Sequence, residues 1–364
     1  MRMLIAGGGT GGHLYPGIAV ARELLARDGS AEVTFAGTAG GIEARVLPRE
    51  GFTLDVIRSG GLKGKSIAER LRGAWLIPLS LADAWQVISR RRPQIVVGVG
   101  GYSSGPVVLV AALRGIPTMV LEQNAVPGLT NRLLAPLVRA AAVTYESTRS
   151  FFGKKAVVSG NPVRPEFFDL GGPSAGEADA DGGSAVVRVL VFGGSQGAHA
   201  VNVAMVEAAP ELASGRPRLR LTHQTGARDV EMVRAGYRTA GIQADVEPFF
   251  YDMPRRLDDA DLIVCRAGAT TLAEVAAAGR AAILIPLPTA TDDHQRKNAE
   301  ALAAAGAADV LLQKEASGSA LAKRILAFAA DDGARARMAG AVRALARPDA
   351  AKVIVDQVMA LVAG

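Results

Sequence analysis

Two glycine-rich loops carry the residue types that best suit the binding of a phosphate group. The first, GGGTGGH, ends at His13, and the second, GGSQGAH, ends at His199. Each loop follows a short apolar run and precedes an amphipathic stretch, which predicts a strand, a tight turn and a helix. Such a turn presents backbone N–H groups and the positive end of the helix to an anion. A plain tight turn explains one such loop, but two matched loops favour phosphate binding.

Both loops differ from the common nucleotide-binding motifs. Neither loop contains the Gly-Lys-Ser or Gly-Lys-Thr that ends a Walker A motif. The strand expected after the first loop ends in FAGTAGG, without the acidic residue of a dinucleotide-binding unit. The sequence therefore argues against a P-loop enzyme and against a dinucleotide-dependent oxidoreductase.

His13 is the candidate for acid–base chemistry. It closes the first loop at the expected helix start, and the chain has only four histidines. A helix N-terminus favours the neutral imidazole, which can accept a proton or orient a ligand. The alternative is an ordinary polar residue at a helix N-terminus.

Polar residues also follow two expected strands of the first half. VLEQNAVPGLTN places a carboxylate beside Asn124 and Asn131, and VSGNPVRPEFF places Arg164 between two prolines. Open α/β sheets bind ligands at the carboxyl ends of their strands. A capped helix start explains the asparagines equally well, and a turn at a domain boundary explains Arg164.

Two motifs of the second half carry similar candidates. Glu274 in CRAGATTLAEVAAAG suits a ribose-binding carboxylate, but Thr271 to Glu274 also fits a capping box. Gln295 lies in the polar segment PLPTATDDHQRKNA. The Asp292-Asp293 pair in that segment has no second cluster of ligands to complete a metal site, so no metal is expected.

The elements that position these residues alternate along the whole chain. β-Branched runs and amphipathic stretches follow one another, which is typical of βαβ units around a parallel sheet. The expected strands cover residues 3–6, 32–36, 95–99, 118–121, 142–145, 156–159, 187–192, 219–223, 245–249, 262–265, 283–286 and 309–312.

The 364 residues are enough for two domains. Since each half opens with the same strand–loop–helix unit, we expect two similar α/β, Rossmann-like domains. We place them at residues 1–165 and 186–364, with the last helix free to pack back on the first domain. Residues 166–185 form the expected linker, because the Gly, Ala and Asp residues that dominate positions 169–185 cannot build a core.

Charge is distributed unevenly between the two halves. Residues 1–165 carry 20 Lys and Arg against 10 Asp and Glu, a net charge of +10, whereas the remainder carries 21 against 25, a net charge of −4. This asymmetry indicates that the first half faces an anionic partner. A nucleic acid is not expected, because the chain shows no recognition motif for one.

The sequence indicates a peripheral rather than a spanning relation to a membrane. The longest uncharged stretch, residues 93–113, contains GVGGYSSGP, whose backbone groups would stay unsatisfied in lipid. Residues 61–93 carry seven basic and two acidic residues around Trp75 and Trp85, which suits an interfacial contact, although helix packing also explains the apolar residues. A single cysteine and the absence of a signal-peptide pattern favour the cytoplasm.

Taken together, the motifs resemble the MurG family of peptidoglycan N-acetylglucosaminyltransferases. The resemblance runs from residue 3 to about residue 345, in order and with matching spacing. The one departure within a motif is Leu121, where a histidine is common. The motifs that carry it are GGGTGGHLYPGIAVA, SGGLKGK, VGVGGYSSGP, LEQNAVPGLTN, SGNPVRPE, FGGSQGA, CRAGATTLAE and DDHQRKNA.

The resemblance implies a GT-B architecture, in which two Rossmann-like domains with parallel sheets face one another across a cleft. It implies transfer of N-acetylglucosamine, with inversion, from its UDP donor to the C4 hydroxyl of the muramoyl sugar in lipid I. The product would be lipid II, a precursor of peptidoglycan. No cofactor is implied. The lipid acceptor implies a peripheral enzyme on the cytoplasmic side of the cell membrane, whose anionic surface residues 61–93 would contact.

The resemblance assigns the donor to the second domain. Ser195 would meet its phosphates, Phe250 would lie near the uracil, and Gln295 would bind the transferred sugar. The loop around the ribose and phosphate would comprise Ala269, Thr270, Thr271, Leu272, Ala273 and Glu274, with Glu274 on the ribose hydroxyls.

The resemblance assigns the acceptor to the first domain. Thr10, Gly11 and Gly12 would hold the acceptor's diphosphate, with Arg164 at the domain junction. Asn124 would contact the transferred sugar from this side. His13 is our choice for the base that deprotonates the acceptor hydroxyl.

Three other functions stay open at this point. Within the same fold they are a different lipid-directed glycosyltransferase, such as a diacylglycerol glycosyltransferase, and a UDP-sugar 2-epimerase. From another class comes a nucleotide-binding scaffold without turnover. Release of UDP in the presence of donor and lipid acceptor distinguishes them.

Overall fold

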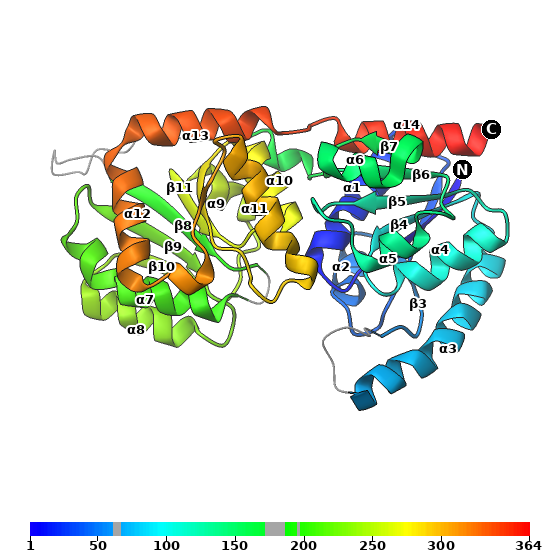
Figure 1. Ribbon diagram of the computed structural model, residues 1–364, viewed down its shortest axis with the longest axis horizontal. Coiled ribbons are helices and arrows are strands. Elements are labelled where there is room, and N and C mark those ends of the chain that lie inside the picture. The colour runs from blue at the N-terminus through cyan, green and yellow to red at the C-terminus, as the bar shows by residue number, and fades with distance from the viewer. Residues whose placement is uncertain (61–66, 172–185, 195–196) are drawn as a thin grey trace. The chain divides into compact units, whose positions relative to one another are not determined.

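The computed structural model describes residues 1–60, 67–171, 186–194 and 197–364 (Figure 1). The chain divides into two compact units. Unit 1 comprises Met1–Val163 together with Arg347–Gly364, and unit 2 comprises Arg164–Ala346. Unit 2 therefore begins at Arg164, and the last helix belongs to unit 1. Most of the expected linker, residues 172–185, lies outside the described residues.

Unit 1 is built around a parallel sheet of seven strands in the order β3-β2-β1-β4-β5-β6-β7. All side chains of β4 and β5 are buried, as expected for inner strands of a parallel sheet that is covered on both faces. The strands are β1 (Arg2–Gly7), β2 (Glu32–Gly37), β3 (Thr53–Val56), β4 (Ile95–Gly100), β5 (Thr118–Glu122), β6 (Ala140–Val143) and β7 (Ala156–Val158).

Helices close both faces of this sheet. Helices α1 (Gly11–Arg27) and α14 (Ala350–Ala363) pack on one face, where Ile354, Val355 and Val358 of α14 join the core. Helices α3 (Ile67–Arg91) and α4 (Ser104–Leu113) contribute to a second core on the other face. The shorter helices α2 (Glu43–Arg49), α5 (Leu129–Leu134) and α6 (Glu146–Phe152) follow strand ends.

Unit 2 repeats this design with six parallel strands in the order β10-β9-β8-β11-β12-β13. The expected doubly wound α/β architecture of each half is therefore present. The strands are β8 (Val187–Phe192), β9 (Leu219–Gln224), β10 (Ala244–Glu247), β11 (Leu262–Cys265), β12 (Ala281–Leu284) and β13 (Asp309–Val310). The helices are α7 (His199–Ser214), α8 (Val230–Ala240), α9 (Met253–Asp258), α10 (Ala269–Ala278), α11 (His294–Ala304), α12 (Gly318–Ala330) and α13 (Asp332–Ala344).

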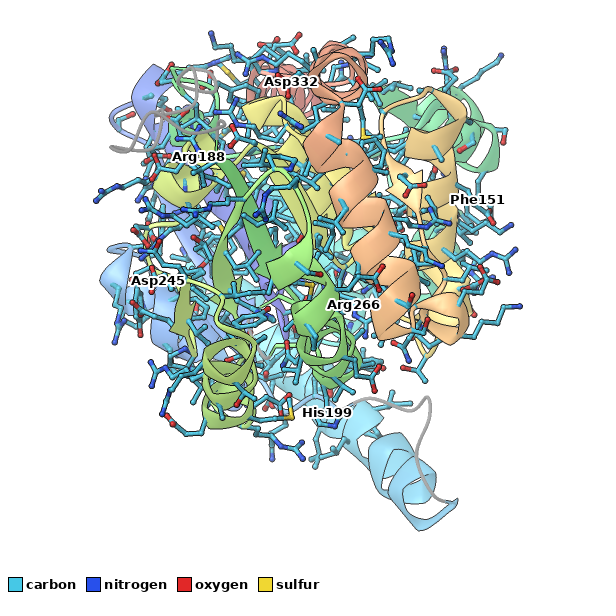
Figure 2. All side chains as sticks on the ribbon, turned by 90° about the vertical axis from the view of Figure 1, so that its left-hand side faces the viewer. Phe151, Arg188, His199, Asp245, Arg266 and Asp332 are labelled. Atoms are coloured by element: carbon cyan, nitrogen blue, oxygen red, sulfur yellow. The ribbon has the colours of Figure 1, made fainter. Side chains whose placement is uncertain are left out.

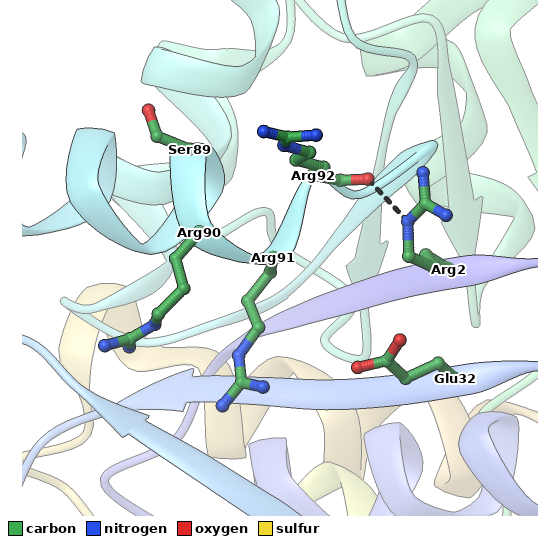
Figure 3. A pocket seen from close by; sticks show the side chains of 6 residues that line it. All are labelled: Arg2, Glu32, Ser89, Arg90, Arg91 and Arg92. Carbon is green, nitrogen blue, oxygen red and sulfur yellow. Dashed lines mark hydrogen bonds between the residues drawn. The ribbon is translucent and has the colours of Figure 1, made fainter.

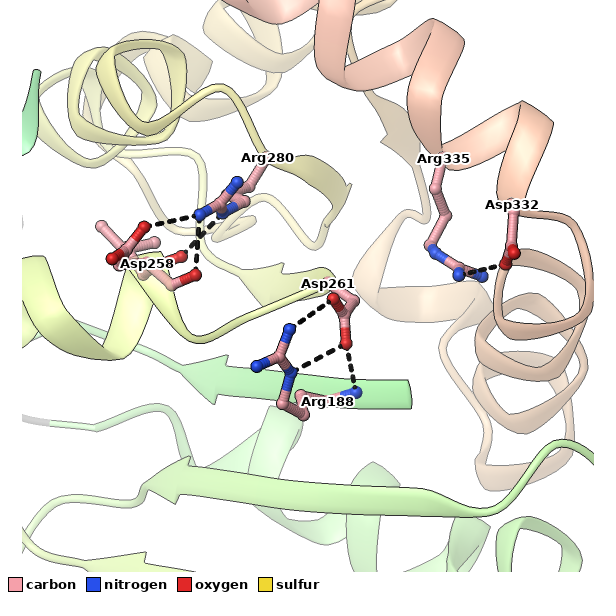
Figure 4. Close-up of polar contacts among 7 residues, drawn as sticks. Arg188, Asp258, Asp261, Arg280, Asp332 and Arg335 are labelled. Carbon is pink, nitrogen blue, oxygen red and sulfur yellow. Dashed lines mark hydrogen bonds and ion pairs between the residues drawn. The ribbon is translucent and has the colours of Figure 1, made fainter. Parts of the chain in front are cut away.

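Ion pairs fix the beginnings of the central strands in unit 2 (Figure 4). The Asp261 carboxylate, just before β11, accepts hydrogen bonds from the Arg188 backbone N–H at 2.8 Å and from Arg188 Nε and Nη2 at 3.1 and 2.9 Å. The buried Arg280 donates to the Leu257 carbonyl and to Asp258. These contacts lie at the amino ends of the strands. A ligand is expected at the opposite edge of the sheet, where the carboxyl ends of the strands lie.

Candidate functional site

The first glycine loop follows β1 and has a backbone that only glycine adopts readily. Gly7, Gly8 and Gly9 have φ values of +143°, +147° and +84°. A Cβ on Gly7 would lie 2.4 Å from the Gly100 carbonyl oxygen, so the loop also needs glycine for the close approach to β4. Gly9 and Thr10 form the exposed tip that leads into α1.

Thr10 and His13 are partners at the start of α1. Thr10 is the N-cap residue, but its side chain caps no backbone N–H. Its Oγ1 lies 3.2 Å from His13 Nδ1 instead. The imidazole stands against Gly100, where an added Cβ would lie 2.7 Å from His13 Cδ2. The structure thus brings the expected phosphate loop and the expected base together.

Glu122 organises the second polar segment of unit 1. Its buried carboxylate accepts hydrogen bonds from the Asn124 backbone N–H and Nδ2 at 3.1 and 3.2 Å, the Gly128 backbone N–H at 2.9 Å and Asn131 Nδ2 at 2.8 Å. Burial raises the pKa of this carboxyl, and the hydrogen bonds oppose the shift. Asn131 is buried and its side chain donates hydrogen bonds within the segment, to the Leu121 carbonyl and to Glu122, whereas Asn124 is partly exposed. Asn124 is therefore the asparagine that a ligand can reach.

The second glycine loop borders a hollow at the carboxyl ends of the unit 2 strands. Ser195 lies outside the described residues, but the flanking Gly193 and Gly197 line this hollow of about 420 Å³. The other lining residues are Ala198, His199, Ala200, Arg266, Leu287, Gln295 and Gln313. Figure 2 labels His199 and Arg266, and Arg188 marks the opposite end of β8.

Arg266 supplies positive charge to this hollow. Its Nη1 donates to the Ile285 and Pro286 carbonyls at 3.0 and 3.2 Å, and its Nη2 donates to Gln313 Oε1 at 2.7 Å. Burial lowers the pKa of this guanidinium. Nearby, Gln295 Oε1 accepts a hydrogen bond from the Leu287 backbone N–H at 3.0 Å, which fixes the orientation of the side-chain amide. Arg266 was not among the site residues expected from sequence, although it lies in the CRAGATTLAE motif.

His199 is held at the start of α7 by a polar chain that runs into the core. Its Nδ1 lies 3.0 Å from Asp229 Oδ2, and the same oxygen accepts a hydrogen bond from Asn202 Nδ2 at 2.7 Å. Asn202 Oδ1 lies 3.0 Å from His223 Nε2, whose ring contacts the Tyr237 hydroxyl at 2.7 Å. This chain joins residues that are up to 38 positions apart in sequence, which explains why no local motif revealed it.

Glu274 does not form a capping box. Helix α10 begins at Ala269 with Gly268 as its N-cap, so Glu274 lies in the second turn, too far from the cap. The capping interpretation is therefore wrong. Burial raises the pKa of the Glu274 carboxyl to about 7, and the positive charge of Arg164 opposes this shift.

Phe250 is not placed for stacking on a base. Its side chain is 3% exposed, and the Arg256 guanidinium lies 4.4 Å from the ring centroid. Its backbone N–H donates to Gln224 Oε1 at 2.8 Å. The resemblance implies that Phe250 lies near the uracil. Because its ring is buried and its N–H is engaged, the group that would contact the uracil is the main-chain carbonyl oxygen.

A separate basic hollow lies at the strand beginnings of unit 1, away from the glycine loop (Figure 3). It measures about 490 Å³ and is lined by Arg2, Glu32, Ser89, Arg90, Arg91 and Arg92. Asp55 accepts hydrogen bonds from Arg90 and Arg91, and Arg2 Nε donates to the Arg92 carbonyl. Two of the four guanidinium groups are therefore engaged by a buried carboxylate.

Comparison with known proteins identifies the family. The glycosyltransferase family 28 N-terminal domain matches residues 3–143, and the family 28 C-terminal domain matches residues 188–354. A protein of Anaeromyxobacter sp. (strain K) is 47% identical over 363 residues, covering 100% of this chain and 93% of its own length. It is named UDP-N-acetylglucosamine--N-acetylmuramyl-(pentapeptide) pyrophosphoryl-undecaprenol N-acetylglucosamine transferase. The chain belongs to glycosyltransferase family 28.

Solved structures agree with this family 28 assignment. MurG of Acinetobacter baumannii superposes with a TM-score of 0.78 at 32% identity, covering 98% of this chain and 99% of that one. The resemblance to the MurG family and the GT-B fold class are confirmed. A UDP-GlcNAc 2-epimerase of Neisseria meningitidis, bound to UDP-GlcNAc, has a TM-score of 0.68 at 12% identity and covers 99% of this chain and 100% of its own. That likeness shows the shared fold alone.

The described residues of this family 28 glycosyltransferase lack two kinds of feature. Over residues 1–60, 67–171, 186–194 and 197–364, no group of three or more His, Cys, Asp or Glu side chains is arranged to hold a metal ion. Within the same residues, no helix is both long enough and apolar enough to cross a membrane.

Proposed function

We propose that the chain transfers N-acetylglucosamine from UDP-N-acetylglucosamine to the C4 hydroxyl of the muramoyl sugar of lipid I, with inversion, and so forms lipid II. The observation that carries this proposal is the 47% identity, over the whole chain, to a transferase named for this reaction. The glycine loops of both units and the hollow beside the second loop supply the phosphate-binding features that the reaction requires.

Unit 2 is the proposed site of the UDP donor. The N-terminus of α7 and the Arg266 guanidinium border one hollow, where both stabilise negative charge. This is the charge that develops on the departing UDP. Glu274 would accept hydrogen bonds from the ribose hydroxyls, with Arg164 beside it in the same unit. The proposed donor-binding residues are Ser195, Phe250, Ala269, Thr270, Thr271, Leu272, Ala273, Glu274 and Gln295. Arg164 stays a proposed substrate-binding residue at the domain junction.

Unit 1 is the proposed site of the acceptor. Thr10, Gly11 and Gly12 start α1, where backbone N–H groups and the helix dipole favour a diphosphate. Asn124 would contact the transferred sugar and is held for this by Glu122. His13 would accept the proton of the acceptor hydroxyl as that oxygen attacks the anomeric carbon and the bond to UDP breaks.

Release of UDP tests the proposal. The wild-type chain is incubated with UDP-N-acetylglucosamine, with and without a lipid I analogue, and both UDP and the glycosylated product are quantified. We expect UDP and product in equal amounts, and only when the lipid I analogue is present. Three other results would contradict the proposal. UDP release with a diacylglycerol acceptor would indicate another lipid-directed glycosyltransferase, and conversion of the donor to its 2-epimer would indicate an epimerase. Binding of the donor without turnover would indicate a scaffold.

We further propose that the chain binds the cytoplasmic face of the cell membrane peripherally, through residues 61–93. Lys63 and Lys65 lie outside the described residues. In the described part of α3, Ile77, Leu79 and Trp85 are 45%, 41% and 56% exposed, and exposed apolar side chains suit the interfacial region of a bilayer. The Arg114 guanidinium lies 4.7 Å from the Trp85 ring centroid and adds positive charge there.

A further inference from the structure

Glu43 is a fully buried carboxylate directly beneath the first glycine loop. It is the first residue of α2 and has no exposed surface. Three glycines make room for it, because an added Cβ on Gly8, Gly37 or Gly41 would lie 2.5, 2.8 or 2.1 Å from its side chain. Gly37 ends β2, Gly41 follows it, and Gly8 belongs to the loop after β1, so the carboxylate fills the space between the two strand ends.

The carboxylate binds both strand ends through hydrogen bonds. Its Oε2 accepts the Gly9 backbone N–H at 2.7 Å. Its Oε1 accepts the Thr38 backbone N–H and the Thr38 hydroxyl, each at 2.9 Å. The two backbone N–H distances, 2.7 and 2.9 Å, lie in the range of hydrogen bonds to a carboxylate. Glu43 therefore ties the exposed loop tip to the end of β2.

A negative charge at this position opposes the binding of an anion to the loop above it, since like charges repel across a short distance. An uncharged side chain would fill the same space without repelling an anion, so filling space does not explain the carboxylate. Glu43 also cannot serve a ribose, as the acidic residue of a dinucleotide fold does, because it is buried and its oxygens already bind the protein. What its carboxylate does is fix Gly9, the residue before Thr10.

We propose that Glu43 is a positioning residue for the acceptor loop. By holding Gly9, it sets the place of Thr10 and the start of α1, and through Thr10 it sets the orientation of the His13 imidazole. It touches no substrate. The role in acceptor use rests on the proposed function, whereas the ordering of the loop does not.

The chemistry of the site indicates which substitutions are informative. Glutamine has the same size, but its amide group donates hydrogen bonds and would face either Gly9 N–H or the Thr38 donors, which also donate. Glu43→Gln therefore leaves either the Gly9 N–H or the Thr38 donors without an acceptor, which weakens the tether without creating a cavity. Thr38→Val is the matched control, because it removes one hydroxyl donor to Oε1 and leaves the Gly9 hydrogen bond in place.

The experiment measures loop order and kinetics separately. Hydrogen exchange of peptides covering residues 7–14 is followed in full-length wild type and both variants, and kcat and KM are determined for the lipid I analogue and for UDP-N-acetylglucosamine. For Glu43→Gln we expect at least tenfold faster exchange in residues 7–14 and at least a tenfold lower kcat/KM for the acceptor. The donor KM should change less than twofold. Thr38→Val should change each quantity less than threefold.

Three outcomes separate the possibilities. The proposal would be overturned if residues 7–14 of Glu43→Gln exchanged hydrogen at the same rate as in wild type. It would also be overturned if Glu43→Gln unfolded at a lower temperature but kept the wild-type kcat/KM for the acceptor. Glu43 would then only stabilise the fold. If wild type itself transfers no sugar, the proposed function fails and the exchange result still decides whether Glu43 orders the loop. Should Glu43→Gln prove insoluble, Glu43→Asp, which keeps the charge but shortens the reach to Gly9, should give the same changes.

Discussion

Thr10 Oγ1 and His13 Nδ1 lie 3.2 Å apart, so the threonine that begins α1 binds the imidazole rather than the helix. The direction of this hydrogen bond decides what His13 can do. If Nδ1–H donates to the hydroxyl oxygen, Nε2 carries the lone pair that accepts a proton from substrate. A general base that acts through Nε2 requires this tautomer, and the Thr10 hydroxyl oxygen is placed to accept its Nδ1–H.

Replacing Thr10 should therefore lower kcat, in addition to weakening the proposed contact with the acceptor's diphosphate. Thr10→Val removes the hydroxyl but keeps the shape, and we expect kcat to fall about tenfold or more, within the range of a general-base contribution. Thr10→Ser keeps the hydroxyl and should stay within about threefold of wild type in kcat, since the hydrogen bond is retained. Steady-state kinetics with the lipid I analogue measure both. Equal loss in the two variants would show that the methyl group, not the hydrogen bond, matters.

Glu274 predicts a pH dependence of donor binding. Burial raises the pKa of its carboxyl to about 7, so the group is protonated at pH 6 and ionised at pH 8. The ionised form is the better acceptor for ribose hydroxyls. Calorimetric titration with UDP-N-acetylglucosamine should thus give tighter binding at pH 8 than at pH 6, by up to about tenfold.

Glu274→Gln provides the control for this titration. It should bind the donor more weakly than wild type at pH 8, with a Kd independent of pH. It should also unfold at a higher temperature than wild type at pH 8. The unfolded carboxyl ionises near pH 4.3, so the stability that its neutral folded form contributes is lost as the pH rises to about 7. A wild-type Kd that does not change between pH 6 and pH 8 would remove Glu274 from the ribose.

Burial of the His223 imidazole should make the free energy of unfolding decrease in acid. Burial lowers the pKa of its imidazole to about 3, whereas in the unfolded chain it is near 6.5. The unfolded state therefore binds more protons below pH 6.5. The contribution of His223 is complete above that pH and decreases by up to about 1.4 kcal/mol per unit as the pH falls toward 3.

Unfolding of His223→Gln between pH 4 and 8 tests this contribution. The free energy of unfolding should decline less steeply with acid than in wild type. Tyr237→Phe removes the hydroxyl that contacts His223, and it should lower stability by about 1–2 kcal/mol at every pH while keeping the steep decline. If His223→Gln kept the wild-type slope, the acid sensitivity would have to come from other groups.

The Asp261–Arg188 pair predicts a change in stability that leaves the donor site intact. Asp261 accepts three hydrogen bonds from Arg188 at the beginning of β8, the opposite end from the glycine loop. Asp261→Ala should lower the free energy of unfolding by about 1–3 kcal/mol, with the Kd for UDP-N-acetylglucosamine within about twofold of wild type. Asp332→Ala removes an exposed ion pair with Arg335 and should cost less than about 1 kcal/mol. Similar losses in both variants would contradict this ranking.

The strands were predictable because each inner strand of a parallel sheet is a short apolar run. All of the expected strands overlap a strand of the structure, whereas β3 was missed. Its sequence, TLDV, lies at the edge of the sheet and has one buried side chain, Asp55. An edge strand with a buried ionised residue carries no apolar pattern to detect.

The site was predictable only where its residues are local. The glycine loops and His13 are contiguous in sequence, so their juxtaposition follows from one turn. Glu43 acts on Gly9 from 34 residues away, and Arg266 acts beside Gln313, 47 residues away. Such pairs depend on which strands are neighbours in the sheet. Glu274 was ambiguous because four residues fit a capping box, and only the observed start of α10 at Ala269 excludes it.

The last prediction concerns membrane binding through α3. Ile77, Leu79 and Trp85 of α3 are exposed. Burial in a membrane interface stabilises such side chains by about 25 cal/mol for each Å² of apolar surface removed from water. The basic residues of 61–93 should add about 1 kcal/mol each near an anionic surface. Asp55 already engages Arg90 and Arg91, so Lys63, Lys65, Arg70 and Arg72 are the more informative charges to reverse.

Co-sedimentation with vesicles separates these contributions. Wild type should bind vesicles that contain anionic lipid and release them as salt is raised, because peripheral charge attraction is screened. The Lys63/Lys65/Arg70/Arg72→Glu variant should lose binding to anionic vesicles, and Ile77→Ser/Leu79→Ser/Trp85→Ser should weaken binding at every salt concentration. Met232→Ser on α8 of unit 2, also an exposed apolar residue, is the control and should bind like wild type. Equal sedimentation of all four proteins, or binding that ignores lipid charge, would mean that the basic residues only solvate a helix and that its apolar residues serve another contact.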